Sequence, residues 1–298
     1  MTRKISVILS LSIALVTLLI LSRSGSFEES LKMWRLIPGK ALLWAFVLYI
    51  LTYPLRAFRW ILLMEDFKGI RTLWEFTIIT GIHTAVTNFL PFKSGELAFP
   101  MLLKGRGHSF SSSMIYLFMG RLMDLSVMIT LFALFYMGLR AFLPVILILS
   151  LIFSFRGKAF RFYEGMSSSA AFLQRFLPAL GRLSRLSMPG GISLFLVTSM
   201  VWMLKLLAVA IITSTVSGDP LGRMLFLSLG AEMAFLVPLS GWLGLGNYEA
   251  GWAIASSLSG PSPDAGAAFF AHTFLILASA IAGLISVFLY FYAKRGRA

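Results

Sequence analysis

Long apolar runs separated by short polar connectors dominate the pattern of the chain. About 20 apolar residues cross the hydrocarbon core of a membrane as a helix. Runs that approach or exceed this length, with no strand-like alternation, predict an all-α polytopic membrane protein. We expect full transmembrane helices at 5–21, 41–64, 113–137, 141–155, 191–216 and 265–292.

Two further apolar regions, 73–103 and 221–258, are interrupted by polar and glycine residues. The first interruption is NFLPFKSGE at 88–96, and the second contains VPLSG at 237–241 followed by GLGNYE at 244–249. Broken segments in corresponding places of two halves are typical of inverted-repeat transporters. Irregular backbone at membrane depth needs protein or water to satisfy its polar groups, so we expect both breaks to face an interior cavity.

The charge of the connectors selects between two topologies. The connector at 156–190 holds six basic residues and one acidic residue, so we expect it in the cytoplasm together with both termini. If 73–103 crossed completely, this connector would fall on the opposite side. Six full spans and two re-entrant hairpins of opposite orientation remove the conflict, whereas eight full spans are the alternative.

Composition agrees with a single integral membrane domain over 1–298. The chain is 58% hydrophobic and 13% charged, against about a quarter charged in soluble proteins. The formal charge of +14 lies in connectors rather than on one helical stripe, which argues against a nucleic-acid partner. The chain has no cysteine, and its three histidines lack ligand spacing, so we expect no metal site and no cofactor.

Charged residues inside the apolar runs are the candidate functional residues, because each is costly in hydrocarbon. Arg56 and Arg59 share a helical face, where they either reach toward headgroups or bind a phosphate. Arg121 and Asp124 are three residues apart and form either a structural ion pair or part of a site.

The remaining acidic residues need partners or a function. Lys205 has no near partner in sequence, so Glu232 or Glu249 is expected to pair with it across helices. Glu96 and Glu249 lie in the breaks, where each is a helix cap or a proton carrier. His272, like His83, is interpreted as a hydrogen-bonded packing residue.

No catalytic cluster is visible, so we do not expect an enzyme. GLGNYE at 244–249 lacks the third glycine and the preceding strand of a dinucleotide fingerprint. Its glycines fit better as a turn whose backbone amides face an anion. A membrane-embedded enzyme acting on a lipid-linked substrate, or a scaffold for a separate synthase, remains the alternative.

Four motifs in this order resemble the flippase-like membrane domain of lysylphosphatidylglycerol synthases. They are LRAFRW at 55–60, NFLPFKSGE at 88–96, RLMD at 121–124, and Pro238 followed by GLGNYE at 244–249. The chain departs from the family's pattern at Phe99, Gly120 and Tyr248, where the family often has charged residues. The soluble aminoacyl-transfer domain of the synthases is also missing up to Ala298, so we expect no synthesis of lysylphosphatidylglycerol.

The resemblance implies a flippase that moves a phospholipid or lipid-linked phosphate between leaflets of a prokaryotic plasma membrane. Its partners would be membrane lipids with an anionic headgroup or a polyprenyl phosphate, and homo-oligomerisation is left open. The candidate substrate-binding residues are Arg56, Arg59, Asn88, Lys93, Glu96, Arg121, Asp124, Lys205, Glu232, Asn247 and Glu249.

The topology can be tested by labelling, because the chain contains no native cysteine. Single cysteines at His108 and Arg175 should both react with an impermeant reagent from the cytoplasmic face, and a cysteine at Gly260 from the opposite face. Labelling of His108 and Arg175 from opposite faces would contradict the re-entrant arrangement.

Overall fold

The computed structural model describes residues 3–66, 68–141, 157–158, 161–165, 180–181, 184–235, 241–260 and 265–295. Within these ranges the chain forms helices and no strand, which confirms the all-α class. The expected span at 141–155, apart from Ala141, lies outside the described residues. Most of the 156–190 connector and the whole of 236–240, with Pro238, also lie outside them.

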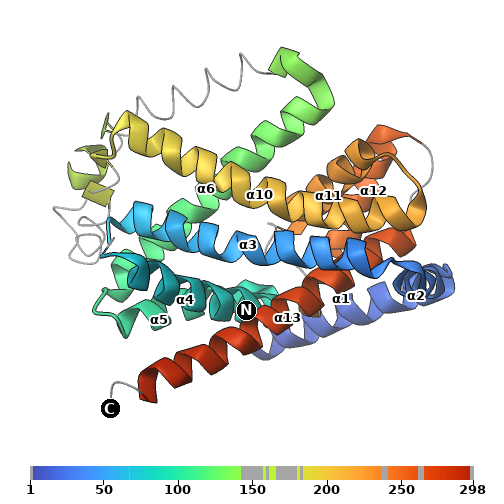
Figure 1. The fold of residues 1–298 in the computed structure, drawn as a ribbon, viewed down its shortest axis with the longest axis horizontal. Helices are drawn as coiled ribbons and strands as arrows, with labels where there is room; N and C mark the ends of the chain where they lie inside the picture. Colours follow the sequence, from blue (N-terminus) through green and yellow to red (C-terminus); the bar gives the residue numbers. More distant parts are fainter. Residues whose placement is uncertain are drawn as a thin grey trace. The chain divides into compact units, whose positions relative to one another are not determined.

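Figure 1 shows the helices in chain order; the connections are short from α1 to η2 and from α10 to α11. In chain order they are α1 (Arg3–Arg23), α2 (Ser26–Leu36), α3 (Gly39–Met64), α4 (Ile70–Phe89), η1 (Pro91–Leu97), α5 (Ala98–Lys104), α6 (Phe110–Met137), η2 (Gly138–Ala141), α10 (Met188–Ser217), α11 (Leu221–Phe235), η3 (Trp242–Gly244), α12 (Asn247–Ser259) and α13 (Ala265–Arg295).

Four of the described helices, α3, α6, α10 and α13, are long and apolar enough to cross a membrane. A fifth span results if α1 and α2 are counted together, although the two are bent by 77°. The bend occurs at Gly25, whose φ of 75° is easily adopted only by glycine. The sequence pattern predicted a complete span at 5–21 within α1, whereas the described residues of α1 qualify as a span only together with α2. The pattern did not predict α2, which is short and mixes charged with apolar residues.

Both interrupted regions are helix–break–helix units. The first consists of α4, the 3₁₀ helix η1 and the short α5, and the second of α11, η3 and α12. Pro91 begins η1 and has no backbone N–H to continue α4, so the α-helix ends just before it. The two breaks expected from the sequence are therefore present.

The chain divides into two compact units. Unit 1 comprises Met1–Tyr53, Thr77–Ala98 and Val201–Ala298, and unit 2 comprises Pro54–Phe76 and Phe99–Met200. The single membrane domain expected from composition stays a prediction.

Small residues allow the close helix packing of unit 1. In α11 and α12, which lie side by side in Figure 1, Gly230 faces Ala255 and the carbonyl of Gly251. The α2 helix packs on α13 through Trp34, whose ring lies 5.0 Å from that of Phe270 and whose Nε1 donates to Thr273 Oγ1 at 3.0 Å. Small residues such as those at the α11–α12 crossing let helices approach each other closely in lipid.

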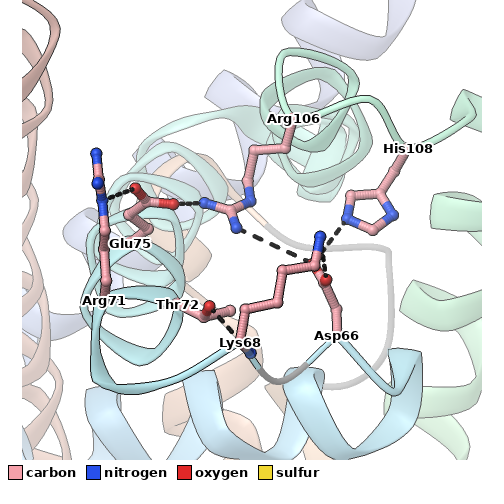
Figure 2. A network of polar contacts seen from close by, with 7 residues as sticks. All are labelled: Asp66, Lys68, Arg71, Thr72, Glu75, Arg106 and His108. Carbon is pink, nitrogen blue, oxygen red and sulfur yellow. Dashed lines mark hydrogen bonds and ion pairs between the residues drawn. The ribbon is translucent and has the colours of Figure 1, made fainter. Parts of the chain in front are cut away.

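Unit 2 is organised around Trp60 and a polar network. The Trp60 ring lies 4.4 Å from that of Phe99, and Gly120 leaves room for it. Figure 2 shows the network that links the α3–α4 connector and the start of α4 to the α5–α6 connector. Arg106 contacts Glu75 of α4 and lies 4.0 Å from Asp66, which also bonds His108 at 3.2 Å. These ion pairs tie the two connectors together.

The close crossing of α11 and α12 predicts unequal effects of two glycine substitutions. A Cβ on Gly251 would overlap the Gly230 carbonyl, so Gly251→Ala should destabilise the protein by about 1–3 kcal/mol. A Cβ on Gly222, also in the α11–α12 pair, meets nothing within 4 Å, so Gly222→Ala should leave stability unchanged or raise it slightly. Thermal unfolding in detergent measures both, and equal melting temperatures for the two variants would contradict the packing.

Candidate functional site

The two breaks meet in unit 1. The η1 and η3 segments contact each other, and α1 contacts both. Trp242 Nε1 in the second break donates to the carbonyl of Phe89 beside the first, at 3.0 Å. Asn88 donates from Nδ2 to Ser279 Oγ on α13 at 3.0 Å, so the first break is also fixed to the last helix. The sequence predicted that the breaks correspond, and the structure adds that they touch.

Close backbone approach at the second break depends on glycine. A Cβ on Gly241 would lie 2.9 Å from the backbone nitrogen of Ala14 in α1, and Gly246 has a φ of 92°. Leu243 lies between them with a φ of 61°, an uncommon conformation for a residue with a branched side chain. Other contacts must therefore hold Leu243 in place.

The contacts that hold Leu243 come from a buried glutamate–histidine pair. Glu249 Oε2 accepts a hydrogen bond from the Gly246 amide at 2.8 Å, which is the helix cap considered from the sequence. Glu249 Oε1 lies 2.7 Å from His272 Nδ1, and His272 Nε2 lies 3.1 Å from the Leu243 carbonyl oxygen. The ring of Tyr248 stacks on His272 at 4.7 Å. The pair thus links α12, the second break and α13.

Four backbone amides of the second break donate hydrogen bonds within the segment. Those of Gly241, Gly244, Leu245 and Gly246 donate to Leu245 O, Gly241 O, Trp242 O and Glu249 respectively. These four amides donate within the segment instead of toward an open site, which argues against an anion-binding turn at these positions.

Lys205 and Glu232 form the ion pair considered from their opposite charges. Lys205 Nζ on α10 lies 2.7 Å from Glu232 Oε2 on α11, and Glu232 is 2% exposed. The Lys205 ammonium also lies 5.2 Å from the ring centre of Trp202. Asn247 donates to the Ala234 carbonyl at 3.3 Å, which joins α12 to α11. Each of these residues connects helices of unit 1.

Three arginines surround one carboxylate in unit 2. Arg59 of α3 donates from Nη1 to Asp124 Oδ1 on α6, and Arg121 donates from Nη1 to Asp124 Oδ2 at 3.4 Å. Arg56 is close enough for its charge to act on both Arg59 and Asp124. The side chains of Arg59 and Asp124 are 5% and 4% exposed, whereas that of Arg121 is 34% exposed.

This arginine group, defined as Arg56, Arg59 and Arg121 around Asp124, has more positive than negative charge. The Arg59–Asp124 pair is satisfied and buried, so it fixes α3 against α6. Arg121 and the half-buried Arg56 add guanidinium charge beside it. Guanidinium groups bind phosphate or carboxylate through paired hydrogen bonds, so the arrangement can attract an anion.

The first break holds the two remaining candidates. Glu96 is half-buried in η1 within unit 1, and the side chain of Lys93 lies outside the described residues. A substrate-binding role for either residue stays a prediction. Within the described ranges, no group of three or more His, Cys, Asp or Glu side chains could hold a metal ion.

Sequence reasoning missed the importance of His272. It noticed the residue in an apolar run but had no means of finding Glu249, 23 positions away, as its partner. It also missed the network of Figure 2, whose members lie in two polar connectors and the first turns of α4.

Removal of the carboxylate of the arginine group should destabilise unit 2. Asp124→Asn leaves Arg59 buried without its counter-charge, which costs about 3–5 kcal/mol. The matched control is Asp219→Asn, whose partner Arg223 is partly exposed, so the loss should be about 1 kcal/mol or less. Thermal unfolding in detergent distinguishes the two, and a melting temperature for Asp124→Asn as high as that of the control would contradict the buried pair.

Comparison with known sequences identifies the family of the chain. A search of curated proteins found no match to the chain. A family model described as the lysylphosphatidylglycerol synthase TM region matches residues 7–283, which include both breaks and the arginine group. The match covers nearly the whole chain and agrees with the helical, membrane-spanning architecture. The protein therefore belongs to the lysylphosphatidylglycerol synthase TM region family.

Proposed function

We propose that this protein moves a phospholipid or a lipid-linked phosphate between the leaflets of a prokaryotic plasma membrane. Membership of the family implies a membrane function related to lipids. The arginine group supports the finer proposal, because it adds positive charge to a helix pair that is long and apolar enough to lie in the membrane.

The position of the charge is the observation that carries the proposal. Asp124 lies in the middle of the 28-residue α6, where an ionised group costs about 2.5–3.5 kcal/mol on insertion scales. Arg59 offsets that cost by pairing with Asp124, but Arg56 and Arg121 bring further charge to the same place. A lipid phosphate supplies the missing negative charge while its acyl chains stay in hydrocarbon.

The two helix–break–helix units support transport rather than simple anchoring. The α11 and α12 helices have 15 and 13 residues and α5 has 7, which at 1.5 Å per residue is well short of the bilayer core. The 20-residue α4 is not among the helices that are both long and apolar enough to cross a membrane. We infer that each unit enters the membrane and returns to the same face, in opposite orientations, with both termini cytoplasmic. Discontinuous helices of this kind allow one part of a transporter to move against another.

The candidate residues of compact unit 2 and those of compact unit 1 have different proposed roles. Arg56, Arg59 and Arg121 would bind phosphate, with Asp124 holding the arginines in place. Asn88, Lys93, Glu96 and Asn247 lie in or beside the breaks, and Lys205 with Glu232 joins α10 to α11, the helix that precedes the second break.

Reconstitution into liposomes with fluorescent lipids of several headgroups tests the proposal. The protein should accelerate leaflet exchange of lipids that bear an exposed phosphate, measured by chemical quenching of the outer leaflet. Arg121→Gln should slow that exchange about tenfold, because one charge-assisted interaction with phosphate is lost while the buried Arg59–Asp124 pair remains.

Arg71→Gln is the matched control, since the Arg71 side chain is 72% exposed and pairs with Glu75 one turn further along α4, in the network of Figure 2. It should exchange lipids at the wild-type rate. An absence of accelerated exchange for every headgroup would remove the proposed transport, and equal rates for Arg121→Gln and wild type would remove the role of Arg121.

A further inference from the structure

The buried pair Glu249–His272 has a hydrogen-bonding requirement that neither residue explains alone. His272 is 2% exposed and contacts two acceptors, the Glu249 carboxyl group on one side of its ring and the Leu243 carbonyl on the other. A backbone carbonyl can only accept, so Nε2 must carry a proton that it donates to Leu243.

The second contact then needs a further proton. With Nε2 protonated, a neutral imidazole presents a lone pair at Nδ1, which would oppose the lone pairs of an ionised Glu249 at 2.7 Å. The contact is a hydrogen bond only when one proton lies between Nδ1 and Oε1, either as imidazolium with carboxylate or as imidazole with carboxylic acid. Loss of that proton leaves one N–H for two acceptors, so either the Glu249 bond or the Leu243 bond must break.

We propose that the Glu249–His272 pair is a proton-binding site that fastens the second break to α13 while protonated and releases it on deprotonation. The proton passes from the pair to water, the electron pair stays on the histidine or the carboxylate, and no other covalent bond is made or broken. Its use to couple lipid movement to a proton rests on the proposed function, whereas the proton-dependent bond does not.

The surroundings provide the pair with few other charges. Tyr248 stacks on His272, and the charge of Glu232 reaches Tyr248 but is paired with Lys205. On α2, which packs against α13, the ionisable side chains are exposed; they are Glu28, Glu29, Lys32 and Arg35. Arg23 at the end of α1 is also exposed. The first break, which contacts the second, holds the half-buried Glu96.

The consequence of release is local to the breaks. Leu243 has a φ of 61°, and its carbonyl accepts a hydrogen bond from His272. The Gly246 amide donates a hydrogen bond to Glu249. Trp242, next to Leu243, bonds the carbonyl beside the first break. Losing the Leu243 or Glu249 bond therefore removes a restraint from the place where the two breaks touch.

Glu249→Gln removes the titrating proton of the pair but can keep its hydrogen bonds with His272 and Gly246. A glutamine side chain can donate from its amide nitrogen to Nδ1 of a neutral His272, and its oxygen can accept from the Gly246 amide. All bonds of the pair survive without a titrating proton. In this variant the second break should therefore stay hydrogen-bonded to α13 at every pH. His272→Phe keeps a flat ring against Tyr248 but cannot form these hydrogen bonds, so the break should lack them at every pH.

The test is a pH titration of the full-length protein in detergent or nanodiscs, with ¹⁵N-labelled histidine observed by NMR. The chain has three histidines, so His272 can be assigned by substitution. As the pH is raised, the wild-type His272 should pass from the paired state, with a proton on each ring nitrogen or one shared with Glu249, to a single N–H. Amide exchange at 243–250, corrected for the intrinsic effect of pH, should rise about tenfold at the same point, because a charge-assisted bond is lost.

The controls decide between outcomes. In Glu249→Gln, His272 should stay neutral and amide exchange slow across the whole range, whereas His83→Gln should titrate as wild type does. Identical titration curves for wild type and Glu249→Gln would overturn the proposal. If lipid exchange is accelerated but its pH dependence survives Glu249→Gln, the coupling fails while transport stands; if the titration occurs without any lipid exchange, the proton site stands and transport fails.

Discussion

The bond between Arg59 and Asp124 is the constraint on which unit 2 depends. A carboxylate in the middle of a long apolar helix is stable only with a counter-charge, and Arg59 supplies it from α3. The pairing fixes the register of α3 against α6, and Trp60, adjacent to Arg59, fills the space left by Gly120. Once that register is set, Arg56 and Arg121 are brought to the same carboxylate, and the excess of guanidinium groups follows from the packing.

Unit 1 depends on a different constraint: the irregular backbone of its two breaks lies among apolar helices and needs hydrogen-bond partners. Its two breaks satisfy their polar groups by contacting each other, α1 and α13. The second break uses its amides internally and relies on Glu249 and His272 for its remaining bonds. Side chains, rather than a regular helix, therefore provide what buried backbone requires. Bonds of this kind can be broken singly, which a continuous helix does not allow.

Much of the architecture could be predicted from the sequence because its signals are local. The long apolar runs gave the helices α3, α6, α10 and α13, and Pro91 gave the end of α4. Opposite charges at Arg121 and Asp124 predicted a pair, since three residues separate them on one face. The resemblance of four motifs predicted the family that the comparison confirmed.

What the sequence could not provide depends on contacts between distant residues. Arg59 and Asp124 are 65 positions apart, and His272 finds Glu249 across 23 positions, so no periodicity links them. The α2 helix was missed because 11 residues of mixed polarity give a weak signal. The acceptors of four amides in the glycine-rich turn, Glu249 among them, are also set by the folded turn and not by the glycines themselves.

The central claim is that the arginine group binds a lipid phosphate. Native mass spectrometry of the purified protein with a phosphate-bearing lipid, and with a neutral glycolipid of the same acyl chains, tests it most directly. We expect the phosphate-bearing lipid to stay bound and to be lost when Arg56 and Arg121 are both replaced by glutamine, with the neutral lipid unaffected. Equal retention of the two lipids, or retention of the phosphate-bearing lipid by the doubly substituted protein, would contradict the claim.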